Sequence, residues 1–439
     1  MQALAFVLLL AVQETDPDWQ LNEEIAAERM KAAAEFEKLK QFAWARAEYS
    51  KVLRLHPDHE EAKAKLEGAT AIPRSNQGKS ASLPARREEL LQSIANKAAA
   101  GFRIKAKALA GEKRDEDALR AWRWTLLYAP TDSSAMSALK LAGKASAAVD
   151  SIYGDANFPA RLIKADAGKP STELSHIDKR WNSNNPKRVT ANLVIEGIGV
   201  PAEALSSLVR VAEAEIAFFR LALGNEQAPL GVQRIVVIAG KEAYYRYIDD
   251  FVGGTPEEKK RQKNTGGMHN EKYREFATWA FPKDNDGLEL IVSHKVAEYM
   301  LPTAWLVWLQ ESAGHLATQL FLQKSGGSCL AAKEGTDASS GDWNDPKKVD
   351  VRLREKVLAG MDDDYEIILN TSLATISSSQ LAKCISIFKF LILRFPERFR
   401  TLVEGAKADA KNHKAVLEKA LGFSLAELDE FWRRWFLAK

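Results

Sequence analysis

The sequence predicts a mostly helical α+β protein, in which helical hairpins precede a domain with a small mixed sheet and a helical C-terminal half. Three observations lead to this fold class. A pattern typical of paired helices occurs twice before residue 148, strand-like and helix-like segments alternate from residue 188, and residues 348–438 are helical in character throughout. A chain of 439 residues is also too long for one small core, so we expect two domains.

The composition indicates a globular chain and argues against some classes of function. The 62 basic and 59 acidic residues leave a formal net charge of +3, and no long run carries one sign. The sequence therefore lacks the basic footprint of a nucleic-acid-binding protein, and we expect no nucleic-acid partner. Apolar residues make up 46% of the chain, which is enough for substantial cores. Beyond the N-terminus no stretch is long and apolar enough to be transmembrane.

The first 13 residues, MQALAFVLLLAVQ, resemble a signal peptide. Residues 3–12 form an apolar run that is too short to cross a bilayer as a helix, and the polar ETDPD follows it closely. We therefore expect residues 1–13 to direct export to the periplasm or the cell exterior. The alternative is a buried N-terminal helix.

Residues 17–148 contain two copies of a hairpin pattern that resembles the tetratricopeptide repeat. Small and aromatic residues recur in 33–57 and again in 106–130 where two antiparallel helices would meet, and a loop rich in Pro, Ser and Gly (70–88) separates the copies. The matching positions are Ala33, Phe36, Phe42, Ala45, Tyr49 and Pro57, followed by Ala106, Ala118, Trp122 and Pro130. The resemblance implies either a surface for a protein or peptide partner or a helical spacer.

Residues 149–187 lack periodicity and are expected to form a connector. After it, we expect a second domain over 188–439 with the following elements. Strands are expected over 188–197 and 232–240, a turn with an edge strand over 265–281, and helices over 201–223, 241–251, 287–301 and 303–323.

The order of these elements, together with four stretches of sequence, resembles the gluzincin (peptidase-MA-like) metallopeptidases. The stretches are the paired strands, TGGMHN (265–270), LIVSHKVAEYML followed by PTAWLVWLQESAGH (290–315), and LGFSLAELDEFWRRWFL (421–437). In active members the first helix carries His-Glu-x-x-His and the next helix supplies a Glu ligand. The resemblance implies an exported bacterial protein that joins tetratricopeptide-like hairpins to a gluzincin-like domain.

Position by position, this chain departs from the active pattern. His294 matches the first zinc ligand and Glu311 the third, whereas Glu298 stands where the second histidine belongs. Lys295 stands at the position of the general base, which must be a carboxylate that takes a proton from zinc-bound water. An ammonium group cannot accept that proton, and loss of a general base alone lowers a rate by about 10²–10⁴-fold.

Two interpretations of this helix pair remain open. Glu311 and His315 are separated by four residues, so His294, Glu298, Glu311 and His315 together offer two histidines and two carboxylates, a set that suits tetrahedral zinc. In the simpler interpretation these residues form only local pairs, including Lys295 with Glu298.

Three further positions are of interest. His269, in the GGMHN turn, either lines the same cleft or faces solvent. Leu381 aligns with a Tyr that relatives carry near the oxyanion. Cys329 and Cys384 could form one disulfide or remain two free thiols, with Cys384 expected in the core.

These observations predict an exported, non-catalytic peptidase homologue that acts by binding or scaffolding and requires no cofactor. One alternative is an active zinc metallopeptidase with an altered ligand set. The other is a purely structural envelope protein.

Overall fold

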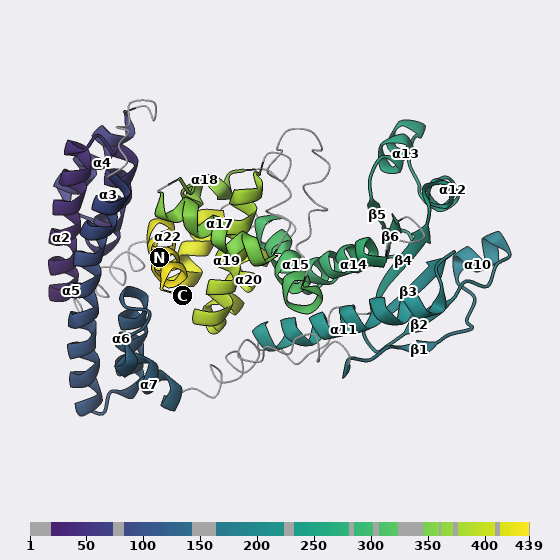
Figure 1. The fold of residues 1–439 in the computed structure, drawn as a ribbon, viewed down its shortest axis with the longest axis horizontal. Helices are drawn as coiled ribbons and strands as arrows, with labels where there is room; N and C mark the ends of the chain where they lie inside the picture. The colour runs from purple at the N-terminus through teal and green to yellow at the C-terminus, as the bar shows by residue number, and fades with distance from the viewer. Residues whose placement is uncertain are drawn as a thin grey trace, which may run out of the picture. The chain divides into compact units, whose positions relative to one another are not determined.

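The computed structural model confirms the α+β fold class, with many helices and one six-stranded mixed sheet (Figure 1). It describes residues 19–72, 83–142, 164–223, 232–280, 285–301, 307–323, 346–359, 361–371, 376–408 and 413–438. The predicted signal peptide over residues 1–13, most of the 70–88 loop and Cys329 lie outside these residues.

The chain divides into two compact units whose boundaries differ from the predicted domains. The hairpin unit comprises Met1–Lys144, Arg354–Ile368 and Leu417–Lys439, and the sheet unit comprises Ala145–Leu353 and Leu369–Val416. The C-terminal segment LGFSLAELDEFWRRWFL therefore belongs with the N-terminal hairpins rather than with the sheet. The predicted connector 149–187, in turn, contributes a helix and strand residues to the sheet unit.

The hairpin unit is built from two three-helix copies. The first contains α2 (Trp19–Lys38), α3 (Phe42–Leu55) and α4 (Glu60–Thr70), and the second contains α5 (Leu83–Gly111), α6 (Asp115–Tyr128) and α7 (Ser133–Ala142). It also contains α18 (Tyr365–Leu369) up to Ile368, α22 (Leu425–Leu437), and parts of α17 (Pro346–Leu358) and α21 (His413–Leu421).

The two copies share one backbone geometry. Lys40, between α2 and α3, has φ of 56°, and Lys113, 73 positions later between α5 and α6, has φ of 60°. The third helix of each copy begins after a side chain that accepts a backbone N–H three residues on, namely His59 before α4 and Asp132 before α7. Most positions of the sequence pattern are buried: Ala33, Phe36, Ala45, Tyr49, Ala106, Ala118 and Trp122. The helical hairpins predicted over 33–57 and 106–130 are thus present.

The sheet has the order β1-β2-β3-β4-β6-β5. Its strands are β1 (Lys169–Pro170), β2 (Lys187–Val189), β3 (Leu193–Ile198), β4 (Gln233–Ala239), β5 (Gly267–Asn270) and β6 (Glu275–Ala280). β3, β4 and β6 are parallel, and the other neighbours pair antiparallel. The prediction of one strand over 188–197 was wrong, since β2 and β3 form a hairpin there. Residues 265–281 likewise hold a hairpin, in which β5 is the edge strand.

Each face of the sheet packs against different helices because successive strand residues point to opposite sides. Ile235 and Val237 of β4 join a core with α11 (Ala202–Leu223) and α14 (Asn285–Met300). Val236 and Ile238 face α10 (His176–Trp181) and α12 (Lys241–Phe251). The other described helices that lie wholly within this unit are α13 (Pro256–Lys263), α15 (Val307–Leu322), α19 (Ser378–Arg394) and α20 (Pro396–Ala408). Sheet and helices together hold α14 in place beside α15.

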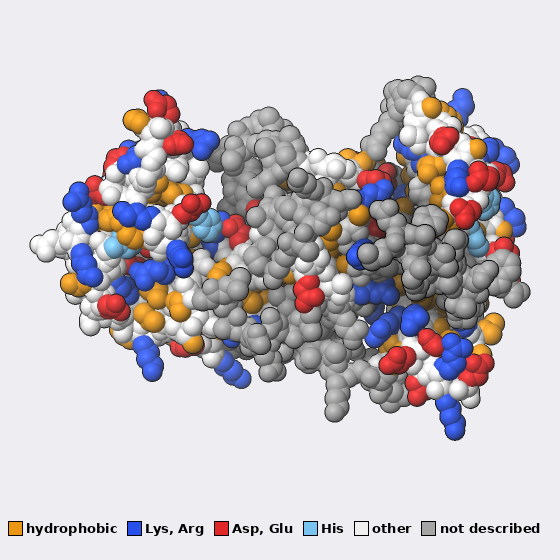
Figure 2. All heavy atoms as spheres, turned by 180° about the vertical axis from the view of Figure 1, so that it is seen from behind, with side chains coloured by type: hydrophobic (Ala, Val, Ile, Leu, Met, Phe, Trp, Pro, Cys, Tyr) orange, Lys and Arg blue, Asp and Glu red, His pale blue; other side chains and the backbone are white. Residues whose placement is uncertain are grey.

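On the face drawn in Figure 2, basic and acidic side chains of the described residues are interspersed. None of the described helices is both long enough and apolar enough to span a bilayer.

Candidate metal centre

The candidate site lies where α14 and α15 pack together. On α14, Leu288, Val292 and Val296 recur every four residues and join the core beneath the sheet. His294 is two positions beyond Val292, so it lies on the opposite side of the helix, where α15 packs. The sheet core therefore fixes the direction in which His294 points.

A glycine allows the two helices to approach at this point. A Cβ atom at Gly314 of α15 would lie 2.9 Å from Cγ and 3.0 Å from Cα of His294, both closer than such contacts normally come. Backbone and ring of His294 therefore occupy the space that any larger residue at 314 would need.

Three of the four predicted ligands converge here. Nδ1 of His294 lies 3.5 Å from Oε2 of Glu311, and Nε2 of His315 lies 3.9 Å from the same oxygen. One donor atom from each of the three residues can be chosen so that all lie within 4.8 Å of one another. The rings of His294 and His315 meet edge to face with centroids 4.5 Å apart.

The site is enclosed, and its histidines are neutral near pH 7. His294 is 6% exposed, Glu311 9% and His315 2%. Burial, with smaller contributions from His315 and Lys295, lowers the pKa of His294 well below its usual range. Burial lowers the pKa of His315 to about 4. Neutral imidazoles keep a lone pair for a metal ion.

The fourth predicted ligand, Glu298, is engaged elsewhere. Its two carboxylate oxygens accept hydrogen bonds of 2.6 and 2.7 Å from Nζ of Lys295. Nε2 of His269, on β5, lies 3.6 Å from Oε2. Burial by itself would raise the pKa of Glu298, but His269 and Lys295 together lower it. The pairing of Lys295 with Glu298, one part of the simpler interpretation, is therefore present in the structure.

Lys295 is held by this contact and by an aromatic ring. Its ammonium group lies 4.4 Å from the ring centroid of Phe276 on β6, a cation–π distance. The residue at the position predicted for the general base is thus an ammonium group bonded to a carboxylate. His269 has a side chain that is 60% exposed and takes no part in the three-residue cluster.

A second polar group lies behind the cluster and was not found from the sequence. Ser293, next to His294, donates a hydrogen bond to Glu215 of α11, and Thr318 of α15 donates to Ser293 at 3.1 Å. The carbonyl oxygen of Gly314, 2.8 Å from Oγ1 of Thr318, is the alternative acceptor for the single proton of that hydroxyl. Burial raises the pKa of Glu215 to about 8. In the sequence, the one sign of this buried polar group is that Glu215 falls on the apolar face of the helix expected over 201–223.

The other candidates from the sequence are structural. Leu381 is buried near the start of α19, and Cys384 is a buried free cysteine in the same helix. The comparison with protein-family models gives no match for this chain, and neither does the comparison with curated proteins. The resemblance to gluzincins therefore stays a prediction.

Proposed function

We propose that the sheet unit binds a divalent cation of the zinc type through His294, Glu311 and His315, and that it does so without peptidase activity. The protein is then a non-catalytic, gluzincin-like binding protein. The observation that carries the proposal is the convergence of two buried, neutral imidazoles and one carboxylate from two packed helices.

The donor set fits zinc in number, type and spacing. Zinc takes imidazole nitrogens and carboxylate oxygens at about 2.0–2.1 Å, so two donors at a tetrahedral angle lie about 3.4 Å apart. The separations from Glu311 Oε2 to His294 Nδ1 and to His315 Nε2 are 3.5 and 3.9 Å, and small side-chain rotations would bring both to this value. Nε2 of His315 is buried and has no hydrogen-bond partner among the described residues, and a metal bond would satisfy it.

The neighbouring charges argue against hydrolysis. Activation of water in a zinc peptidase requires a free carboxylate beside the first ligand. In this chain that position holds Lys295, and the nearby Glu298 is bonded to it through both oxygens. These contacts support a binding role over the active-peptidase alternative.

Metal analysis of the purified full-length protein tests the proposal. We expect about one zinc per chain after zinc loading and dialysis, and a rise in unfolding temperature with added zinc because the cation binds the folded state. His294→Ala, Glu311→Ala and His315→Ala should each abolish both effects. His269→Ala is the matched control, since this histidine lies outside the cluster and should keep them.

Two outcomes would contradict the proposal in different ways. Folded wild-type protein without zinc, and with no thermal shift, would favour the purely structural alternative. Zinc-dependent peptide cleavage by the wild type would favour the active enzyme. The Lys295→Glu/Glu298→His variant is informative here, because it restores the His-Glu-x-x-His pattern and should gain cleavage only if the scaffold is that of a gluzincin.

A further inference from the structure

The inner face of the hairpin unit carries a different chemistry in each of its two copies. The geometric repeat of 73 positions makes Arg29, Glu48 and Lys51 of the first copy equivalent to Phe102, Ala121 and Trp124 of the second. One half of this face is charged, and the other half is apolar and aromatic. The rings of Phe102 and Trp124 stack with centroids 5.5 Å apart.

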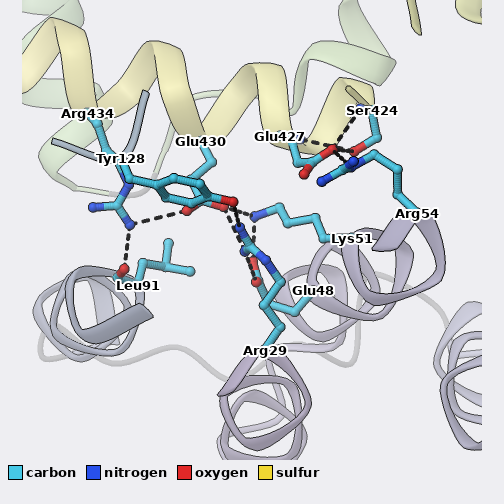
Figure 3. A network of polar contacts seen from close by, with 10 residues as sticks. All are labelled: Arg29, Glu48, Lys51, Arg54, Leu91, Tyr128, Ser424, Glu427, Glu430 and Arg434. Carbon is cyan, nitrogen blue, oxygen red and sulfur yellow. Dashed lines mark hydrogen bonds and ion pairs between the residues drawn. The ribbon is translucent and has the colours of Figure 1, made fainter. Parts of the chain in front are cut away.

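The charged half binds one carboxylate of the C-terminal helix α22. Oε2 of Glu430 accepts hydrogen bonds from Arg29 at 2.9 Å and from Lys51 at 2.6 Å (Figure 3). Glu48 bonds the same two cations at 2.7 and 2.6 Å. One helical turn earlier in α22, Glu427 pairs with Arg54 of α3.

The aromatic half contacts the next residue of the same helix. The ring of Phe431 lies 5.1 Å from that of Tyr128 and 6.0 Å from that of Trp124, both edge to face. Phe423, just before α22, lies 6.4 Å from Trp124. The helix thus places acidic groups against the cations and a ring against the rings.

Burial makes the acidic group necessary. Arg29 is 0% exposed, Lys51 3% and Glu430 3%. Charged side chains are almost never buried to this degree without partners. Without Glu430, two buried cations would share the single carboxylate of Glu48, which leaves one positive charge uncompensated. The face is therefore built for a helix that brings a carboxylate.

We propose that the inner face of the hairpins is a helix receptor, and that its resident ligand is the chain's own segment 423–436. The receptor binds the side chains of Glu427, Glu430 and Phe431, which form a Glu-x-x-Glu-Phe pattern on one helix. While this segment is seated, the face is closed to other partners. The hairpins therefore bind the C-terminal segment of their own chain and do not offer a free surface to other proteins. This inference does not depend on the metal site.

A labelled peptide of residues 422–438 tests the proposal in trans, with full-length protein. Wild-type protein should not bind the peptide because the face is filled. The Glu427→Lys/Glu430→Lys protein should bind it, and at least about 30-fold more tightly than a peptide with the same two reversals, since loss of a buried charge partner has effects of this size. Lys419→Glu, a charge reversal at an exposed position of α21, should behave as wild type.

Two results would overturn the proposal: a folded double variant that binds neither peptide, or one that binds both equally. If the double variant does not fold, a variant in which the two partners exchange charges tests the proposal instead. Glu430→Lys combined with Lys51→Glu restores the balance of charges, so it should recover the wild-type circular dichroism and unfolding temperature. Failure of the exchange to restore folding would refute the pairing.

Discussion

Replacing Glu215 by Gln should stabilise the protein at alkaline pH and change its stability little at acid pH. The side chain is fully buried in α11. One carboxyl oxygen accepts a hydrogen bond from Ser293, and the other has no hydrogen-bond partner among the described residues. Burial raises the pKa from 4.5 to about 8, so the folded protein keeps a proton that the unfolded chain releases.

The sign and size of the effect follow from proton linkage. Between pH 4.5 and 8 the folded state binds more protons at Glu215 than the unfolded state does, so this group makes stability fall as pH rises through the interval. One pKa unit corresponds to about 1.4 kcal/mol, which gives on the order of 5 kcal/mol over the full interval. Gln has nearly the same shape and no charge, and it removes this loss.

The measurement is urea unfolding of wild type and Glu215→Gln at pH 5.5, 7 and 9. The stability difference in favour of the variant should grow with pH and level off above pH 8. Glu203→Gln is the matched control, because Glu203 is an exposed acid on the same helix and should show little change. A difference between Glu215→Gln and wild type that is the same at all three pH values would refute the reasoning.

Three other predictions concern single groups. Gly314→Ala should weaken zinc binding at least about tenfold and destabilise the protein by about 1–3 kcal/mol, because the added Cβ overpacks against His294. Gly68→Ala is the control: a Cβ there meets nothing within 4 Å, so the variant should be more stable by up to about 1 kcal/mol. Titration calorimetry measures zinc binding, and scanning calorimetry measures the stability of each variant. The metal-free protein should lose stability as pH falls from 6.5 towards 4, because His315 must take up a proton that its buried position disfavours, and an NMR titration should place its pKa near 4. Cys384, whose pKa burial raises to about 12, should resist alkylation at pH 8 in the folded protein and react only after unfolding, as peptide mass spectrometry can show.

The sequence predicted the regular elements well where periodicity was long. The helices expected over 201–223 and 241–251 were confirmed within one residue as α11 and α12. The hairpin within 188–197 was missed because its turn contains no Gly or Pro. Oγ1 of Thr190 accepts hydrogen bonds from the backbone N–H groups of Asn192 and Leu193, and this side-chain turn is hard to distinguish from strand sequence.

The sequence did not reveal that the C-terminal helix belongs with the hairpins. Its apolar pattern would suit many partner surfaces, and the contacts specific to the hairpins include buried ion pairs as well as ring contacts. Arg29 and Glu430 are separated by about 400 positions. Charged residues in a sequence normally indicate solvent exposure, so a buried pair at such a distance gives no local signal.

At the candidate site, one of the two interpretations left open by the sequence grouped His294, Glu298, Glu311 and His315, and it did not anticipate the direction of Glu298. Spacing of four residues places Glu298 and His294 on one helix face, yet the choice of partner depends on what else lies within reach. Lys295 on the same helix and His269 on β5 both attract this carboxylate. The sequence also shows no sign of the close helix contact at Gly314 or of the hydrogen bond between Ser293 and Thr318, because both exist only where α15 packs against α14.

The two departures from the peptidase motif are connected by one contact. Because Lys295 bonds both oxygens of Glu298, the residue at the position predicted for the base also engages a candidate ligand. His315 supplies a second imidazole in its place, from the helix that already carries Glu311. The number and type of donors, two imidazoles and one carboxylate, are those of a His-Glu-x-x-His site with its Glu ligand, but the second imidazole comes from α15. A helix that departs from the predicted motif is therefore compatible with a set of three donors across two helices, and this is why we propose metal binding without hydrolysis.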